Sequence, residues 1–426
     1  FKKNKTRQTA SKSYYRKMFE IEALEPKLLL SAAPIEAPEY VPTENDISQA
    51  IEEDISYNTN IKELDLSASS IDMTYLINED GDVSIGTGDY SLLENGNFAF
   101  LNGSLLEFED TRSVVGSQGA DTFVFAEDFV LPDEPDFDFS IWGGEGNDEL
   151  VVLGEDSTWY ITGHDSGNVG NINFNELENL TGGQDNEDTF VLEDSGRLSG
   201  GIEGGDGGFD ILQVNGSYDH SIYEMTGPQS GRLILDGINF DYAGLEPINI
   251  LDGTSDVTID LSKLDDLTNG FSSDDKATLK YDTSLSKLSF SSDDGGFESH
   301  SFSMPADSLT IKLGAGNDEL SIKEITDFTG SLTIEMGSGD DILTFNNTLS
   351  LQNKDLNIDG GTNKGGFLNE LVSDENDKVV FSGNIFTHGG DIDVKAEHIE
   401  VKDNITIATR QISGTVVSEH ETGTDE

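Results

Sequence analysis

The stretch Gly143-Gly-Glu-Gly-Asn-Asp148-Glu-Leu-Val-Val152 decides the fold of this chain, because versions of it recur along most of the sequence. Each version is a glycine-rich turn, followed by an aspartate and then by alternating apolar residues. Alternation with a period of two places every second side chain on the same face of a strand. The motif therefore predicts a tight turn that leads into a short strand with one buried face.

Six further copies share this order of residue types, and one of them lacks the glycines. Their aspartates are Asp121, Asp188, Asp210, Asp318, Asp341 and, in the copy without glycine, Asp377. Including Asp148, the successive aspartates are 27, 40, 22, 108, 23 and 36 residues apart. Three of these intervals match one coil of a parallel β-solenoid, in which each turn lies beside the preceding one. We expect the longer intervals to be loops, or coils whose turn has drifted in sequence.

The predicted fold class is all-β: an elongated parallel β-solenoid or β-helix-like body behind a disordered basic leader. A composition of 46 Gly and only 35% hydrophobic residues favours many short strands, frequent turns and a thin core. In each coil, alternate side chains of the strand are expected to point inward. The expected inward pairs are Phe123 and Phe125, Leu150 and Val152, and Leu343 and Phe345.

Charge and composition exclude several classes of function. The 426 residues carry a formal charge of −59, the wrong sign for a nucleic-acid binder. There is no cysteine, so the chain has no disulfides, thiolate zinc sites or cysteine nucleophiles. No run reaches the roughly 18 apolar residues of a transmembrane helix, so we expect no transmembrane segment.

The N-terminal residues differ from the rest of the chain. Residues 1–27 hold eight basic and three acidic residues, a balance of +5, so the other 399 residues carry −64. Four of the nine prolines follow between Pro26 and Pro42, which predicts an extended linker. The predicted organisation is a basic leader with its linker (1–45), a β-rich lead-in (46–115), a Gly/Asp-turn repeat block (116–250) and a second solenoid block (251–426).

Within the leader, Leu24, Glu25, Pro26, Leu28, Leu29 and Leu30 resemble the LEPR-XLL element, with Lys27 where arginine is usual. This element occurs near the N-terminus of very large, repetitive, exported bacterial proteins. The resemblance implies a secreted or cell-surface protein, and secretion machinery that acts on the N- or C-terminal regions of a longer parent.

The repeated turn is also suited to binding calcium. A turn rich in glycine exposes carbonyl oxygens, and the following aspartate adds a carboxylate, which are the hard oxygen ligands that Ca²⁺ prefers. Stacked coils would place these carboxylates ~4.8 Å apart, where they repel one another and attract a divalent cation. The predicted ligand residues are Gly116, Gly119, Asp121, Gly144, Gly146, Asp148, Asp188, Asp210, Gly314, Gly316, Asp318, Gly337, Gly339 and Asp341. The alternative is that Gly, Asn and Asp serve turn geometry alone.

The same turns resemble the RTX nonapeptide, a calcium-binding repeat of secreted Gram-negative proteins. The best match is Gly143, Gly144, Gly146, Asp148 and Leu150. Gly314, Gly316, Asp318 and Leu320 match apart from Ala315, and Gly116, Gly119, Asp121 and Phe123 match apart from Ser117. RTX repeats run in tandem every nine residues, whereas these copies are isolated, so an ion would have to lie between coils or in a single turn.

Residues 382–410 resemble the repeats of filamentous-haemagglutinin-type exoproteins, which form right-handed β-helices. The apolar residues that alternate with polar ones here are Ile392, Val394, Ile399, Val401, Ile405 and Ile407. Such repeats imply an open solenoid end, as expected if further repeats follow in a longer parent.

An enzyme is the rival interpretation, since parallel β-helices also carry polysaccharide lyases, epimerases and glycosidases. The six histidines are scattered, each expected in a solvated turn, and only 16 basic residues follow Lys27 to neutralise an anionic substrate. The sequence therefore favours a non-catalytic, adhesin-type β-solenoid spacer that binds Ca²⁺. Host, biofilm-matrix or cell-surface ligands would be bound by other parts of a longer chain. A purely structural acidic solenoid without calcium remains the other alternative.

Overall fold

The computed structural model describes residues 54–78, 81–87, 90–92, 98–100, 106–126, 139–250, 253–265, 273–361 and 376–409. Contacts group Asp54–Glu426 into one unit. The predicted leader, residues 1–45, lies outside the described residues. Within the described residues no helix is long and apolar enough to cross a membrane.

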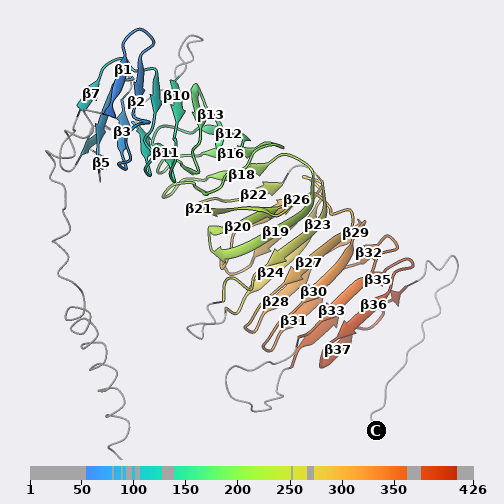
Figure 1. Cartoon of the computed structure of the whole chain (residues 1–426). Helices are drawn as coiled ribbons and strands as arrows, with labels where there is room; N and C mark the ends of the chain where they lie inside the picture. The colour runs from blue at the N-terminus through green and yellow to red at the C-terminus, as the bar shows by residue number, and fades with distance from the viewer. Residues whose placement is uncertain are drawn as a thin grey trace, which may run out of the picture. The chain divides into compact units, whose positions relative to one another are not determined.

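The described residues form β-strands joined by short turns, and most of the strands belong to two long sheets (Figure 1). Sheet A contains Ser56–Asn58 (β1), Glu63–Asp65 (β2), Ser113–Val115 (β8), Phe139–Trp142 (β10), Thr158–Gly163 (β12), Ser166–Val169 (β13), Ile172–Asn175 (β14), Thr189–Leu192 (β16), Ile211–Val214 (β18), Ile248–Ile250 (β22), Lys276–Asp282 (β24), Lys287–Ser292 (β25), His300–Phe302 (β26), Glu319–Ile322 (β28), Ile342–Phe345 (β31), Lys378–Phe381 (β34) and His398–Val401 (β37).

Sheet B contains Thr74–Ile77 (β3), Val83–Gly86 (β4), Leu106–Phe108 (β7), Thr122–Phe125 (β9), Glu149–Val152 (β11), Asn179–Thr181 (β15), Gly201–Glu203 (β17), Tyr218–Gly227 (β19), Ser230–Leu235 (β20), Ile238–Ala243 (β21), Thr254–Asp260 (β23), Ser308–Lys312 (β27), Ser331–Glu335 (β30), Leu356–Asp359 (β33) and Ile392–Lys395 (β36). A third, small sheet contains Ile325–Phe328 (β29), Leu349–Leu351 (β32), Ile385–Phe386 (β35) and Ile407–Ala408 (β38), and Tyr90–Leu92 (β5) pairs with Phe98–Phe100 (β6).

The chain passes back and forth between sheets A and B, and each strand pairs in parallel with the corresponding strand one coil later. In sheet B, Leu309 of β27 pairs with Leu332 of β30, which in turn pairs with Leu356 of β33. In sheet A, Leu343 of β31 pairs with Val379 of β34. The predicted all-β fold is confirmed for the described residues, and the long parallel sheets make it β-solenoid-like.

Three antiparallel meanders interrupt the regular coils and lie within the 40- and 108-residue intervals between aspartates. Strands β12, β13 and β14 form one of them in sheet A, and β24, β25 and β26 form another. Strands β19, β20 and β21 form the third in sheet B. Two of the three lie between Asp210 and Asp318. That interval also contains the turn with Asp275, which stacks on the turn with Asp318 although its sequence has drifted from the motif, so the expectation of a drifted coil is met there.

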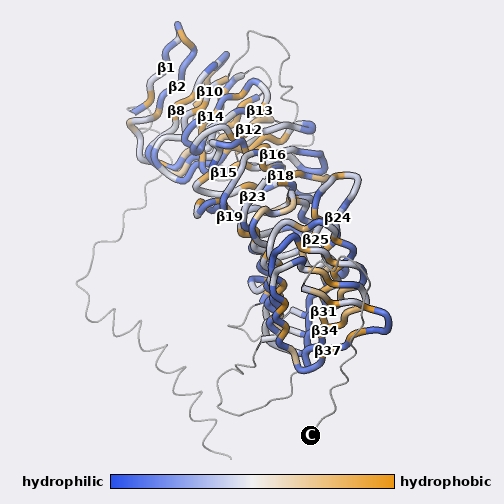
Figure 2. The backbone as a smooth tube through the Cα atoms, turned by 90° about the vertical axis from the view of Figure 1, so that its right-hand side faces the viewer, coloured by the Kyte–Doolittle hydropathy of each residue, from blue (hydrophilic) through white to orange (hydrophobic). Residues whose placement is uncertain are grey.

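The core lies between the sheets, where the inward side chains stack coil upon coil. The expected inward residues Phe123, Phe125, Leu150, Val152, Leu343 and Phe345 are all buried, which confirms that prediction. Aromatic rings continue the stacking, with the centroids of Phe345 and Phe381 5.2 Å apart and their planes 13° from parallel. Figure 2 shows hydrophobic and hydrophilic residues alternating along the stacked strands.

Candidate functional site

The predicted ligand residues all lie in turns that connect the two long sheets, but these turns form two columns instead of the one expected. The turns with Asp121 and Asp148 lead from sheet A to sheet B. The turns with Asp188, Asp210, Asp318 and Asp341 lead from sheet B to sheet A. The same turns hold Gly116, Gly119, Gly144, Gly146, Gly314, Gly316, Gly337 and Gly339. The meander β12–β14 separates the two columns along the sequence.

In the first column, each acidic side chain accepts a hydrogen bond from the backbone of the coil before it. Met73 N donates to Asp121 Oδ1 at 2.8 Å, and Asp121 N donates to Asp148 Oδ1 at 2.7 Å. Asp148 N donates in turn to Glu178 Oε2 at 2.6 Å. These carboxylates therefore join successive coils, one rung at a time.

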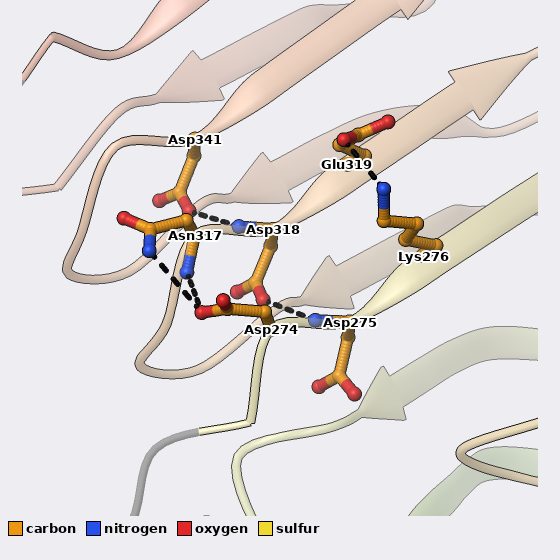
Figure 3. Close-up of polar contacts among 7 residues, drawn as sticks. All are labelled: Asp274, Asp275, Lys276, Asn317, Asp318, Glu319 and Asp341. Carbon is orange, nitrogen blue, oxygen red and sulfur yellow. Dashed lines mark hydrogen bonds and ion pairs between the residues drawn. The ribbon is translucent and has the colours of Figure 1, made fainter. Parts of the chain in front are cut away.

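The second column repeats the same bond. Ser157 N donates to Asp188 Oδ1, and Asp188 N to Asp210 Oδ1, both at 2.7 Å. Figure 3 shows the next run, in which Asp275 N donates to Asp318 Oδ1 and Asp318 N to Asp341 Oδ1, both at 2.8 Å. The run ends where Asp341 N donates to Asp377 Oδ1 at 3.0 Å. We call these side chains, together with the first column, the aspartate ladder.

Sequence reasoning missed two members of this ladder. Asp275 follows Ser273 and Asp274 without any glycine, and Glu178 replaces aspartate in its coil. A signal for Asp275 was present, because Ala277 and Leu279 alternate after it as apolar residues do after the other aspartates. The Glu178 turn has no comparable signal. Its sequence differs from the motif, and the longer glutamate side chain accepts the backbone N–H of Asp148 in place of an aspartate.

A second, exposed row of bonds runs beside the ladder in the opposite direction. Asn317 N donates to Asp274 Oδ1 at 2.7 Å (Figure 3), and Asp340 N donates to Asn317 Oδ1 at 2.9 Å. Asn376 N continues the row by donating to Asp340 Oδ1 at 3.0 Å. In this run the polar residue before the rung bonds the following coil, while the rung aspartate bonds the preceding one. This explains the pairs Asp274-Asp275, Asn317-Asp318 and Asp340-Asp341.

The glycines are required because successive turns approach each other closely. Gly339 has a φ of +137°, and a Cβ atom there would collide with the carbonyl oxygen of Gly316 in the preceding turn. At Gly116, an added Cβ would lie 2.6 Å from Asp121 Oδ2 and would overlap the carbonyl oxygen of Gly143. Glycine therefore makes room for the neighbouring coil and for the ladder carboxylate.

Burial leaves several ladder carboxylates only partly satisfied. Asp148, Asp210, Asp275 and Asp318 are at most 2% exposed, and the Oδ2 atom of each has no hydrogen-bond partner among the described residues. Burial raises the pKa of Asp318 to about 8 and that of Asp148 to about 7, outweighing the backbone donors that stabilise the charged form. Burial likewise raises the pKa of Asp210 and Asp275 to about 6.

The ladder can act chemically as a set of backbone acceptors, as proton-binding groups, or as a source of carboxylate oxygens for a cation. In the described ranges, no three His, Asp or Glu side chains come together in a group that could hold a metal ion. The first role is carried by the hydrogen bonds above. Calcium binding at these turns stays a prediction.

Three described histidines differ from the expectation that all lie in solvated turns: His220 and His398 lie in strands β19 and β37 with exposed side chains, and His300 is buried. His300 lies in β26 and is 1% exposed. Its Nε2 is 3.3 Å from the Tyr242 hydroxyl, and its Nδ1 is 2.9 Å from the carbonyl oxygen of Glu298. Burial lowers its pKa to about 4, so the ring is neutral and forms part of the core.

One groove bears on the enzyme alternative. It has a volume of about 690 Å³ over the outer face of β9, β11 and β15, and the carboxylates of Asp72, Glu149, Glu203 and Asp206 line it. Thr181 Oγ1 donates to Glu149 Oε1 at 2.6 Å. The described lining contains no Lys, Arg or His, so it gives an anionic polysaccharide no positive charge to bind.

Comparisons with known proteins identify no relative of this chain. No protein-family model matches it, and neither a curated protein nor a solved structure does.

Proposed function

We propose that this chain is a non-catalytic β-solenoid spacer of adhesin type, exported to the surface of the cell or beyond it. The observation that supports this best is the use of the repeated motif. Asp318 and Asp341 bond the backbone of the preceding coil, so the most repeated feature of the sequence serves coil stacking. A chain built in this way extends by adding coils, and an elongated stack would hold distal binding parts away from the cell.

The surface assignment rests on the LEPR-XLL resemblance and can be tested in the source organism. Antibodies raised against the chain should label intact cells without permeabilisation, while a cytoplasmic marker stays unlabelled. Labelling that requires permeabilisation would contradict the exported spacer.

We propose, as a second part of this function, that Ca²⁺ stabilises the stack. The unpartnered Oδ2 atoms of Asp148, Asp210, Asp275 and Asp318 and the charge of −59 support this proposal. Low calcium inside the cell would then leave the chain loose for export, and higher calcium outside would order it. Circular dichroism melts in chelator and in millimolar CaCl₂ test the idea, with MgCl₂ as the control for ionic strength. Identical melting temperatures in chelator and calcium would remove calcium from the function and leave the purely structural solenoid.

A further inference from the structure

The last described coil differs from the coils before it in the exposure of its inward-facing side chains. Ile399 and Val401 of β37 are 52% and 49% exposed. Their partners one coil earlier, Val379 and Phe381 of β34, are 0% and 2% exposed. Ile407 of β38 is 38% exposed, whereas its partner Ile385 is fully buried. The difference arises because no described strand covers this side of the coil.

The backbone of this coil is open in the same way. Among the described strands, β36 pairs only with β33, β37 only with β34, and β38 only with β35. An edge of this kind offers a row of N–H and C=O groups that can pair with another chain. The outward polar side chains along it are Asp393 and Lys395 on β36, and His398 and Glu400 on β37.

The opposite end of the stack does not match this edge. There, sheet A ends in β1, which pairs antiparallel with β2, and sheet B ends in the antiparallel strands β4 and β7. Strand β1 consists of Ser56, Tyr57 and Asn58, so it has no aliphatic side chain to cover Ile399 and Val401. Head-to-tail stacking of copies would therefore leave the exposed aliphatic residues without suitable partners.

The edge formed by β36 and β37 does match the same edge of a second copy in a tail-to-tail arrangement. Two copies related by a two-fold axis pair equal strands antiparallel, and residues directly opposite each other share one face. If the axis passes through Val394, then Asp393 of each copy lies opposite Lys395 of the other. If it also passes through Ile399, then His398 of each copy lies opposite Glu400 of the other. One axis can serve both strands, because Val394 and Ile399 are each the second residue away from the Ala396–Glu397 turn.

We propose that two copies of this chain associate tail to tail through β36 and β37, about a two-fold axis that passes through Val394 and Ile399. The contact places Ile399 of each copy opposite Ile399 of the other, places Val401 beside the Ala396–Glu397 turn of the second copy, and extends both long sheets across the interface. It closes into a dimer instead of growing into a filament, since a two-fold contact uses the same surface on both copies. The proposal does not depend on the proposed function.

Sedimentation velocity of the full chain at several micromolar concentrations tests the proposal. We expect a species of twice 46.1 kDa that dissociates on dilution. Lys395→Asp should weaken the dimer by about tenfold or more, because the symmetry places Asp393 opposite the new aspartate twice. The double reversal Asp393→Lys with Lys395→Asp should restore the wild-type dissociation constant within about threefold. Both variants change exposed side chains, and circular dichroism checks that each remains folded.

A monomer at all concentrations overturns the proposal, including a monomer whose edge is covered by residues 410–426 of its own chain. A dimer that is insensitive to Lys395→Asp, or is not restored by the double reversal, overturns it as well. A cysteine variant locates the axis, since the chain has no cysteine of its own. Residues opposite each other in antiparallel strands have Cα atoms ~4.5–5.5 Å apart, within reach of a disulfide. Ile399→Cys should thus form a covalent dimer on mild oxidation, whereas the exposed control Leu285→Cys should not.

Discussion

Replacing Asp318 tests whether its carboxylate stabilises the stack by accepting a hydrogen bond or by its negative charge. In Asp318→Ala the backbone N–H of Asp275 loses its acceptor at a buried position, which costs about 1–3 kcal/mol of unfolding free energy. In Asp318→Asn the side-chain Oδ1 still accepts that N–H, and a neutral amide replaces a buried carboxylate whose pKa burial raises to about 8. We therefore expect Asp318→Asn to stay within about 1 kcal/mol of the wild-type chain at pH 8, on the same scale of buried-group costs.

The assay is urea unfolding at pH 8 in chelator, followed by circular dichroism, with the midpoint and slope compared among the three proteins. Asp282→Asn serves as the matched control, because Asp282, the last residue of β24, accepts the backbone N–H of Ser284 at an exposed position outside the ladder. Equal destabilisation by Asn and Ala at position 318 would refute the reasoning, since it would show that the negative charge, and not the accepted hydrogen bond, stabilises the stack. Repeating the unfolding in CaCl₂ tests whether Asp318 is also a calcium ligand. If it is, the loss of unfolding free energy in Asp318→Asn grows as the calcium concentration rises; if it only accepts the hydrogen bond, the loss does not change.

Three further predictions concern the ladder, the turns and the core. Stability should rise between pH 8 and pH 5 in chelator. Burial raises the pKa of Asp121 to about 6, and it also raises the pKa values of Asp148 and Asp318. In this pH range the folded chain therefore binds protons that the unfolded chain, with carboxyl pKa values near 4, does not bind. This stabilisation is complete only below the unfolded value and is lost as the pH rises through 6 to 8, so a higher urea midpoint at pH 8 than at pH 5 would contradict it. Gly339→Ala should destabilise the fold by several kcal/mol, because its Cβ would collide with Gly316 and the position has a positive φ. A Cβ at Gly253 meets no atom within 4 Å, so Gly253→Ala should lie within ~0.5 kcal/mol of wild type. Thermal melts compare the two variants directly. Ile322→Ala, at a fully buried position, should cost about 2–5 kcal/mol in urea unfolding, and a cost below that of a typical surface substitution would mean that the interior is not packed as described.

Much of the fold follows from the sequence because the motif contains both of its structural elements. The glycine-rich turn and the alternation after Asp148 predict a turn and a strand with one buried face. The turn and the strand are present, but Val151 on the other face is buried too, against Leu76, Phe100 and Val124. Repetition of the motif then predicts parallel stacking, since equal units bury their apolar faces best against one another. The inward residues such as Phe123 and Leu343 follow from period-two alternation alone.

The remaining features depend on which strand lies beside which, and spacing along the sequence does not contain that information. The meander β24–β26 reads locally as three alternating strands, and only its pairing with β22 and β28 places it within the stack. The two columns of the ladder likewise depend on the direction in which the chain crosses between sheets. The sequence leaves the role of the aspartates open for the same reason. A carboxylate after a glycine-rich turn can bind a cation or accept a backbone N–H, and that N–H belongs to the neighbouring coil.

The stacking of coils in the stated register is the central claim, and disulfide trapping tests it most directly. Thr310 and Thr333 are 23 residues apart in sequence yet pair directly on neighbouring strands β27 and β30. Strands in a sheet lie ~4.8 Å apart, so Thr310→Cys with Thr333→Cys should form an intramolecular disulfide on mild oxidation, as shown by loss of both free thiols in a monomeric band. Thr310→Cys with Glu335→Cys, two residues out of register on the same face, should remain reduced. Oxidation of the second pair in preference to the first would contradict the register, and with it the ladder that depends on it.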